Sequence, residues 1–307
     1  MKIDKLLNIK YPIIQGGMAY ISTSALAAAV SNAGGLGQVA TGGFSPDEIR
    51  REIRKTKELT DKPFGVNVVL MHPDVDEIID IVIDEGVKII TCGAGNPAPY
   101  FKKWLEADLI VIPIIASVKM AKKVEALGAK ACAFEGAEAG GHIGYLNTFP
   151  ELPAIVDSVN IPVIAAGGVY TGRHIFAAEV LGASGVQIGT RLLVAKETPT
   201  VEAYKKALIN ADDTDSIVTG ITTKMPSRVF KNKLAQRLNE IETSQGDMEE
   251  FFNLAEGSGK RAVEGDIEGG SIFCGQGLFY LNRIEGVKEI LDNLMKEYKS
   301  IRGNFKN

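Results

Sequence analysis

The chain has 307 residues, of which 45% are hydrophobic and 23% charged, and its formal net charge is −4. Nothing in this balance favours nucleic acid or a membrane surface as a partner. The three cysteines, Cys92, Cys132 and Cys274, lack CxxC spacing and a nearby histidine cluster, which argues against a disulfide framework and a zinc site. The N-terminus has no signal-peptide-like apolar region, and the longest apolar run (109–118) is too short to span a bilayer. We therefore expect a soluble, cytoplasmic protein without a metal.

Up to about residue 197, short apolar runs alternate with amphipathic ones. A strand at 12–18 is followed by a helix at 23–34 and a second strand at 35–41, and Ser45-Pro46-Asp47-Glu48 reads as a capping box that starts the next helix. The remaining units predict strands at 64–70, 88–95, 109–116, 131–136, 161–168 and 185–190, alternating with helices at 74–86, 97–107, 117–128, 149–160 and 172–182.

Eight strand–helix units predict an α/β fold, a (β/α)₈ TIM barrel. The strands are apolar on both faces, as a parallel sheet covered by helices requires. An open, doubly wound sheet is the competing architecture.

The pattern changes after the eighth strand. Residues 198–267 are polar, and we interpret them as helical and strand-free, whereas 286–298 has the apolar spacing of a helix. This predicts a barrel made of residues 1–197 plus 268–307, with a small helical domain at 198–267 inserted after strand eight. Such an insertion emerges at the C-terminal face of the barrel, where it is well placed to act as a lid or substrate domain.

Glycines follow several of the predicted strands, and two of these clusters indicate a phosphate site. AAGGV (165–169) ends strand seven and QIGTR (187–191) ends strand eight. The loops after these strands commonly hold a phosphate in barrels of this type, through backbone N–H groups and a helix N-terminus. Tight turns are the simpler explanation for any single pair of glycines. GLGQVA (35–40) resembles a dinucleotide fingerprint but follows a helix, which is the wrong context.

His142 lies in the glycine-rich stretch EGAEAGGHIG (135–144), directly after strand six. This position puts it over the barrel mouth, and histidine is the side chain best suited to proton transfer near neutral pH. A solvent-exposed loop histidine is the alternative. His72 and His174 are interpreted as ordinary loop and helix-start residues.

Five basic residues occur without an acid between positions 224 and 237. A solvated helix face is the plainer interpretation, and attraction of an acidic protein or a phosphate-bearing chain is the other. The residues are Lys224, Arg228, Lys231, Lys233 and Arg237.

The order of motifs along the chain resembles one family. The motifs are YPIIQGGM (11–18), KPFGVNVVL (62–70), TCGAGNP (91–97), EGAEAGGHIG, PVIAAGGVYTG (162–172), QIGTR and GDIEGGSIFCGQ (265–276). They resemble the flavin-dependent enoyl-[acyl-carrier-protein] reductases of bacterial type II fatty-acid synthesis, which belong with the nitronate monooxygenases (2-nitropropane dioxygenases). GAGNP and the GGS…GQ segment lean toward the reductases.

The resemblance implies FMN on the barrel, NADH or NADPH as reductant, an acyl carrier protein or acyl-CoA thioester substrate, and a homodimer. It implies His142 as the catalytic residue, donating a proton to the substrate or polarising its carbonyl. Phe273-Cys274 replaces residues that are small or methionine in many relatives, and Cys274 lies near the flavin or is simply a buried, inert thiol. The implied cofactor-binding residues are Gly17, Met18, Ala19, Asn67, Glu135, Gly140, Gly141, Ala166, Gly167, Gly168, Gln187, Gly189, Thr190, Gly275 and Gln276.

Three functions are consistent with these residues. The leading one is an NAD(P)H-dependent reductase of the trans-2 double bond of enoyl thioesters. The second is a nitronate monooxygenase, in which His142 handles the acidic α-proton of a nitroalkane and O₂ is the acceptor. The third is a barrel that binds flavin or phosphate without catalysis.

Overall fold

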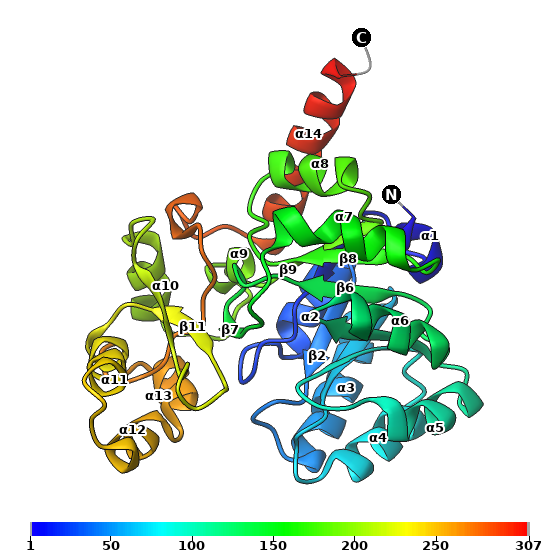
Figure 1. Cartoon of the computed structure of the whole chain (residues 1–307). Coiled ribbons are helices and arrows are strands. Elements are labelled where there is room, and N and C mark those ends of the chain that lie inside the picture. Colours follow the sequence, from blue (N-terminus) through cyan, green and yellow to red (C-terminus); the bar gives the residue numbers. More distant parts are fainter. Residues whose placement is uncertain (1, 306–307) are drawn as a thin grey trace.

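The computed structural model describes residues 2–305, and its centre is a barrel of eight parallel strands (Figure 1). The strands are hydrogen-bonded in the order β1-β9-β8-β6-β5-β4-β3-β2, and a parallel bridge from Ile14 of β1 to Leu36, next to β2, nearly closes the ring. All eight predicted strands are confirmed, and the open sheet is excluded. Their bounds are β1 Ile13–Gln15, β2 Gly37–Ala40, β3 Phe64–Val69, β4 Ile89–Gly93, β5 Ile110–Ile115, β6 Cys132–Glu135, β8 Val163–Ala166 and β9 Gly185–Ile188.

Helices cover the outside of the barrel as predicted. Ser45 accepts a hydrogen bond from the backbone N–H of Glu48, and the Glu48 side chain accepts one from that of Ser45, so the capping box is confirmed. The last long helix packs against α2 and α8 and thereby takes the place of the eighth barrel helix. The helices are α2 Ser24–Ala33, α3 Pro46–Leu59, α4 Val75–Asp84, α5 Phe101–Glu106, α6 Val118–Ala126, α7 Thr148–Ser158, α8 Gly172–Val180, α9 Thr190–Leu193 and α14 Val287–Asn304.

One end of the barrel is plugged by a short helix, α1 (Ile3–Leu7). Ile3 and Leu7 are fully buried and pack in one cluster with barrel-interior side chains such as Ile14 and Ile112. Burial of each such side chain contributes about 1.5–3 kcal/mol. The backbone N–H of Ile3 donates to Ser184 O, which precedes β9, so the plug occupies the end where the strands begin. This leaves the opposite end of the barrel, at the carboxyl ends of the strands, for a binding site.

The segment between β9 and α14 contains strands, so the expectation of a strand-free insertion is wrong. Its elements are α10 Glu202–Ile209, β10 Ser216–Thr219, β11 Ser227–Phe230, α11 Lys233–Thr243, α12 Met248–Ala255 and α13 Ser258–Glu264. β10 and β11 pair antiparallel, and β11 also pairs with β7 (Gly141–His142) from the glycine-rich stretch after β6. The segment lies beside the barrel mouth (Figure 1). Its role as a separate lid domain stays a prediction.

The 224–237 basic run is not a continuous helix face. Arg228 lies on β11 and is buried, and Arg237 is paired with Glu250 at 2.8 Å. Lys231 and Lys233 remain exposed. The interpretation as one solvated helix face is therefore wrong, because the strand β11 turns Arg228 toward the barrel.

Across residues 2–305, no helix is long and apolar enough to cross a membrane. Cys92, Cys132 and Cys274 are free and buried.

Candidate active site

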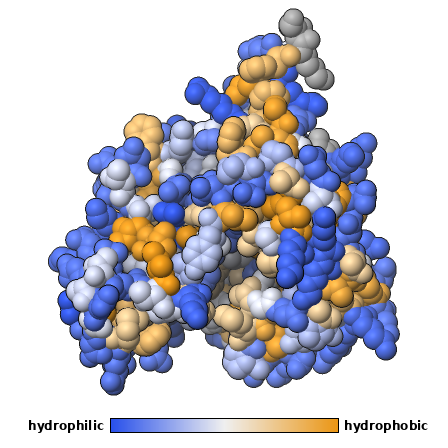
Figure 2. All heavy atoms as spheres, viewed as in Figure 1, coloured by the Kyte–Doolittle hydropathy of each residue, from blue (hydrophilic) through white to orange (hydrophobic). Residues whose placement is uncertain are grey.

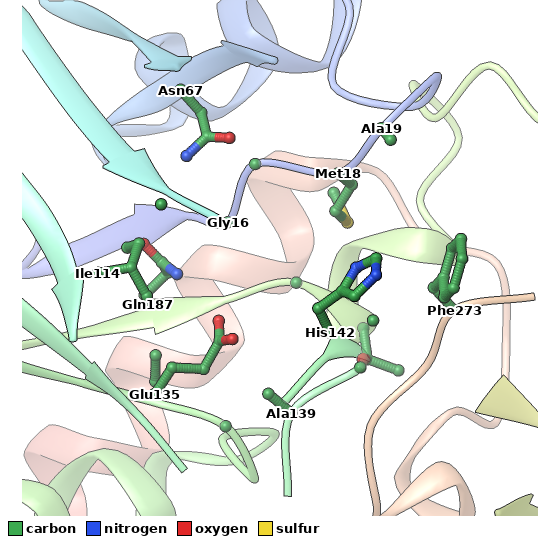
Figure 3. Close-up of a pocket in the computed structure, with 18 of the residues that line it drawn as sticks. Gly16, Met18, Ala19, Asn67, Ile114, Glu135, Ala139, His142, Gln187 and Phe273 are labelled. Carbon is green, nitrogen blue, oxygen red and sulfur yellow. The ribbon is translucent and has the colours of Figure 1, made fainter. Parts of the chain in front are cut away.

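A cavity of about 400 Å³ opens at the carboxyl ends of the barrel strands (Figure 3). In the space-filling view the molecule is hollowed between the segment that carries β11 and the barrel (Figure 2). All of the predicted site residues line the cavity except Gly275 and Gln276. The lining residues are His142, Gly17, Met18, Ala19, Asn67, Glu135, Gly140, Gly141, Ala166, Gly167, Gly168, Gln187, Gly189 and Thr190.

Gly275 and Gln276 do not line the cavity, but the backbone of each bonds to a residue that does. The backbone N–H of Gly275 donates to the hydroxyl of Thr190 at 2.9 Å, and that of Gln276 donates to the carbonyl of Glu138 at 2.9 Å. Both residues thus support lining residues, and direct contact with a cofactor stays a prediction for them.

Asn67 is fixed at the cavity by a buried polar network. Its Nδ2 donates to Thr91 Oγ1 at 2.8 Å, and Thr91 donates to Gln38 Oε1 at 2.7 Å. This leaves the Asn67 carbonyl oxygen as an acceptor toward the cavity. Gly17 is required here, because a Cβ on Gly17 would lie 2.2 Å from the Asn67 amide. A rigid amide next to a bare backbone suits a flat, polar-edged ligand such as a flavin.

His142 reaches the cavity because β7 pairs with β11. His142 lies opposite Ser227, and the neighbouring Gly141 has φ +79, with nothing within 4 Å of the position its Cβ would take. The imidazole is accessible from the cavity, yet the surrounding protein lowers its pKa, because desolvation disfavours the imidazolium. At neutral pH the ring is therefore mainly neutral, which suits hydrogen bonding to a carbonyl.

Phe273 faces His142 across the cavity mouth (Figure 3). The two ring centroids are 6.4 Å apart with an angle of 29° between the planes. Phe273 is held there because it bridges Val229 of β11 and Phe230 N–H donates to Ile272 O at 2.8 Å. The same segment explains why residue 140 is a glycine, since a Cβ on Gly140 would lie 2.6–2.8 Å from the backbone of Cys274.

Glu135 ends β6 and points its carboxyl group into the cavity (Figure 3). No ion pair to this carboxyl occurs among the described residues, and burial raises its pKa to about 7. A carboxyl group with this pKa is present in both protonation states near neutral pH, so it can donate or accept a hydrogen bond from a bound ligand.

The two predicted phosphate loops adjoin each other. Gly167 has φ +92 and Gly168 φ +71, which place consecutive residues in the left-handed region that favours glycine. Thr190 directly follows Gly189 within the second loop, QIGTR. Gln187, on β9, has a buried side-chain oxygen with no hydrogen-bond partner within the described chain. Such an oxygen needs a donor, which a flavin ring N–H or a ribityl hydroxyl offers, so the residues present fit FMN.

The sequence missed several lining residues, among them Glu138, Ala139, Tyr170 and Phe273. Ala139 and Tyr170 lie inside the motifs EGAEAGGHIG and PVIAAGGVYTG, so their membership of these motifs was a usable signal. Phe273 stood in a motif that the resemblance singled out, but the sequence did not indicate that it would face His142.

The other two histidines and Cys274 are not among the residues that line the cavity. His72 Nε2 lies 3.1 Å from the carbonyl of Phe44, and His174 Nδ1 accepts from the backbone N–H of Tyr170 at 3.1 Å. Burial strongly raises the pKa of the Cys274 thiol, so this thiol is inert. Within residues 2–305, no group of three or more His, Cys, Asp or Glu side chains is arranged to hold a metal ion.

Comparison with known proteins identifies the family. Residues 1–80 and 72–297 match the model of the family described as nitronate monooxygenase. The chain belongs to this family. It is therefore an oxidoreductase, and the expected superfamily is confirmed.

Individual relatives have different names. FabK from Thermotoga maritima is 41% identical, with a TM-score of 0.96, over 99% of this chain and 97% of that one. A Mycobacterium tuberculosis protein named (3aS,4S,5R,7aS)-5-hydroxy-7a-methyl-1-oxo-octahydro-1H-indene-4-carboxyl-CoA dehydrogenase is 36% identical over 80% of this chain and 70% of its own length. A probable nitronate monooxygenase from Staphylococcus saprophyticus is 31% identical over 98% of each chain. This last alignment runs over 348 residues, against 307 in this chain, so it contains gaps.

Proposed function

We propose that this protein is an FMN-dependent enoyl-[acyl-carrier-protein] reductase, using NADH or NADPH to reduce the trans-2 double bond of enoyl thioesters. The observation that carries the proposal is the end-to-end similarity to FabK at 41% identity. The match to a relative named as a carboxyl-CoA dehydrogenase adds that acyl thioesters are handled within the family.

Bound FMN would supply the hydride chemistry, taking a hydride from reduced nicotinamide and passing it to the β-carbon of the enoyl thioester. The glycine loops at Gly167–Gly168 and at Gly189–Thr190 would bind its phosphate. Asn67 and Gln187 would hydrogen-bond its polar groups, because Asn67 offers an amide held in place by Thr91 and Gln187 a buried side-chain oxygen without a partner among the described residues. Glu135 would line the buried side of the site, where its carboxyl group can donate or accept a hydrogen bond.

His142 has two roles open to it in this reaction. As an acid it would deliver the proton to the α-carbon, which requires the imidazolium form. As a neutral ring it would donate a hydrogen bond to the thioester carbonyl. The two roles predict different pH dependences of the rate around the lowered pKa of His142. Imidazolium catalysis would make thioester reduction faster as the pH falls through that lowered pKa, whereas carbonyl binding would leave the rate flat or lower it there.

A nitronate monooxygenase is the second candidate, and the full-length match to the Staphylococcus saprophyticus relative favours it. In that reaction His142 would accept the α-proton of a nitroalkane. At similar mutual coverage, the identity of 41% to FabK against 31% to this relative favours the reductase.

The deciding experiment is anaerobic stopped-flow spectroscopy of the flavin. For a reductase, NADH or NADPH bleaches the flavin, and crotonyl-CoA restores its colour. His142→Ala should leave bleaching within a few-fold of wild type and slow the restoration by about 10²–10⁴-fold. Failure of both nucleotides to bleach the wild-type flavin, together with rapid bleaching by a nitronate, would establish the monooxygenase instead.

The remaining proposals concern partners and location. We propose an acyl carrier protein as the natural thioester donor, with Lys231 and Lys233 as exposed cations able to attract its acidic surface. The homodimer and the cytoplasmic location are proposed from the resemblance and from the need for reduced nicotinamide.

A further inference from the structure

Arg228 is a buried arginine that forms no salt bridge with any residue that the structure describes. Only 9% of its surface is exposed, and its Nε donates to the carbonyl of Ala137 at 3.1 Å. No carboxylate oxygen lies within 4.0 Å of its guanidinium nitrogens among the described residues. Placing a charged group in such a setting is costly unless an opposite charge compensates it.

The cavity itself lacks a lysine or arginine among its lining residues, although the ligand proposed for it carries a phosphate. Its carboxylates are Glu135 and Glu138. The Glu138 carboxylate already has hydrogen-bond partners, because it accepts hydrogen bonds from the backbone N–H of Thr148 at 3.0 and 3.1 Å and from the Thr148 hydroxyl at 2.9 Å. Arg191 follows the second phosphate loop but is paired with Glu285. An anionic ligand would therefore find no free cation in the wall.

Arg228 stands behind the part of the wall that carries the first phosphate loop. Its charge attracts the Glu138 carboxylate and the Tyr170 hydroxyl, both of which line the cavity, so Arg228 offsets the negative charge that Glu138 places beside the first phosphate loop. The Cβ of Glu138 lies 3.5 Å from the position of a Cβ on Gly168. Strand β11 sets this placement, because Arg228 lies opposite Gly141 in the pairing with β7.

We propose that Arg228 favours the phosphate group of the bound flavin nucleotide by offsetting, through the cavity wall, the negative charge of Glu138 beside the first phosphate loop. This rests on the proposed FMN cofactor. A phosphate monoester carries a charge of about −1.5 to −2 at pH 7, and Coulomb interactions across a protein wall are several times stronger than in water. The inserted segment thereby contributes to the choice of FMN over riboflavin, which has no phosphate.

The experiment compares FMN with riboflavin on cofactor-free protein, following the quenching of flavin fluorescence. Arg228→Gln should raise the Kd of FMN by about tenfold or more and leave that of riboflavin within about twofold, since only FMN carries the charge. Arg228→Lys, which keeps the charge, should recover most of the FMN affinity. Arg237→Gln is the matched control, because Arg237 is on the same segment but exposed and paired with Glu250.

Two results would overturn the proposal. Equal weakening of FMN and riboflavin would show that Arg228 acts by holding the Ala137 loop, and unchanged FMN affinity would show that its charge is irrelevant. Thermal unfolding of each cofactor-free variant checks that the fold is retained. Wild-type protein that binds neither flavin would overturn the cofactor assignment itself, an outcome distinct from a wild type that binds FMN and a variant that binds it equally well.

Discussion

Replacing Glu135 by glutamine should stabilise the cofactor-free protein at pH 8 and have little effect at pH 5. Burial raises the pKa of this carboxyl group from 4.5 to about 7 in the folded protein. The folded state therefore holds the proton more tightly than the unfolded state does. Such a group favours folding below the unfolded pKa, and this contribution is lost as the pH rises through the folded pKa.

The size of the effect follows from the two pKa values. A difference of about 2.5 between 4.5 and about 7 corresponds to about 3 kcal/mol at pH 8, since each unit is worth about 1.4 kcal/mol. Glu135 is partly accessible through the cavity, so water there reduces the gain to about 1–3 kcal/mol. Glutamine has nearly the same shape and no charge, and it should avoid this penalty.

The assay is urea unfolding of cofactor-free wild type and Glu135→Gln between pH 5 and 8, followed by circular dichroism. The difference in the free energy of unfolding should grow with pH, with its midpoint between the two pKa values. A difference that is constant across this range would refute the reasoning, because it would show that the carboxyl group does not change its proton binding on folding.

Further predictions concern other parts of the site. Gly168→Val should reduce FMN occupancy of the purified protein more than Thr190→Ala, because a β-branched residue is strained at φ +71 and blocks close phosphate approach, as the flavin-to-protein absorbance ratio would show. Glu285→Gln should lower the free energy of unfolding by about 3–5 kcal/mol in urea titrations, since it leaves Arg191 buried without its partner. Phe273→Ala should raise the KM of the enoyl thioester by roughly threefold to tenfold in steady-state assays, with flavin reduction unchanged. Lys231→Glu should weaken turnover of carrier-bound substrate more than that of the CoA thioester, increasingly at low salt.

The barrel was predictable because its signals are local. Each strand is a short, mostly apolar run, and Ser45 and Glu48 mark a helix start through contacts only three residues apart. The turn after β8 was predictable for the same reason, because Gly167 and Gly168 favour a backbone in which two consecutive residues take positive φ, whereas phosphate binding there stays a prediction. Local chemistry was sufficient for both.

The strands outside the barrel were not predictable in this way. Ser216–Thr219 and Ser227–Phe230 are each four residues long, and neither has the alternation of a half-buried strand. Their stability as strands depends on pairing with each other and with Gly141–His142, which lies more than eighty residues earlier in the chain. Segments of four residues give no sign, in their own sequence, of such a distant pairing partner.

The same pairing explains why Arg228 was misread. In the sequence it is one of five basic residues within fourteen positions that contain no acid, and exposure is the usual outcome for an arginine. In the fold, pairing with β7 places Ser227 opposite His142 and Arg228 opposite Gly141. Because neighbouring side chains of a strand point to opposite faces, β11 can support the histidine face of the site with one residue and place a charge behind its wall with the next. Arginine is usually a surface residue, and Arg228 is buried near the site because of its position in the sheet. A local sequence pattern does not indicate that position.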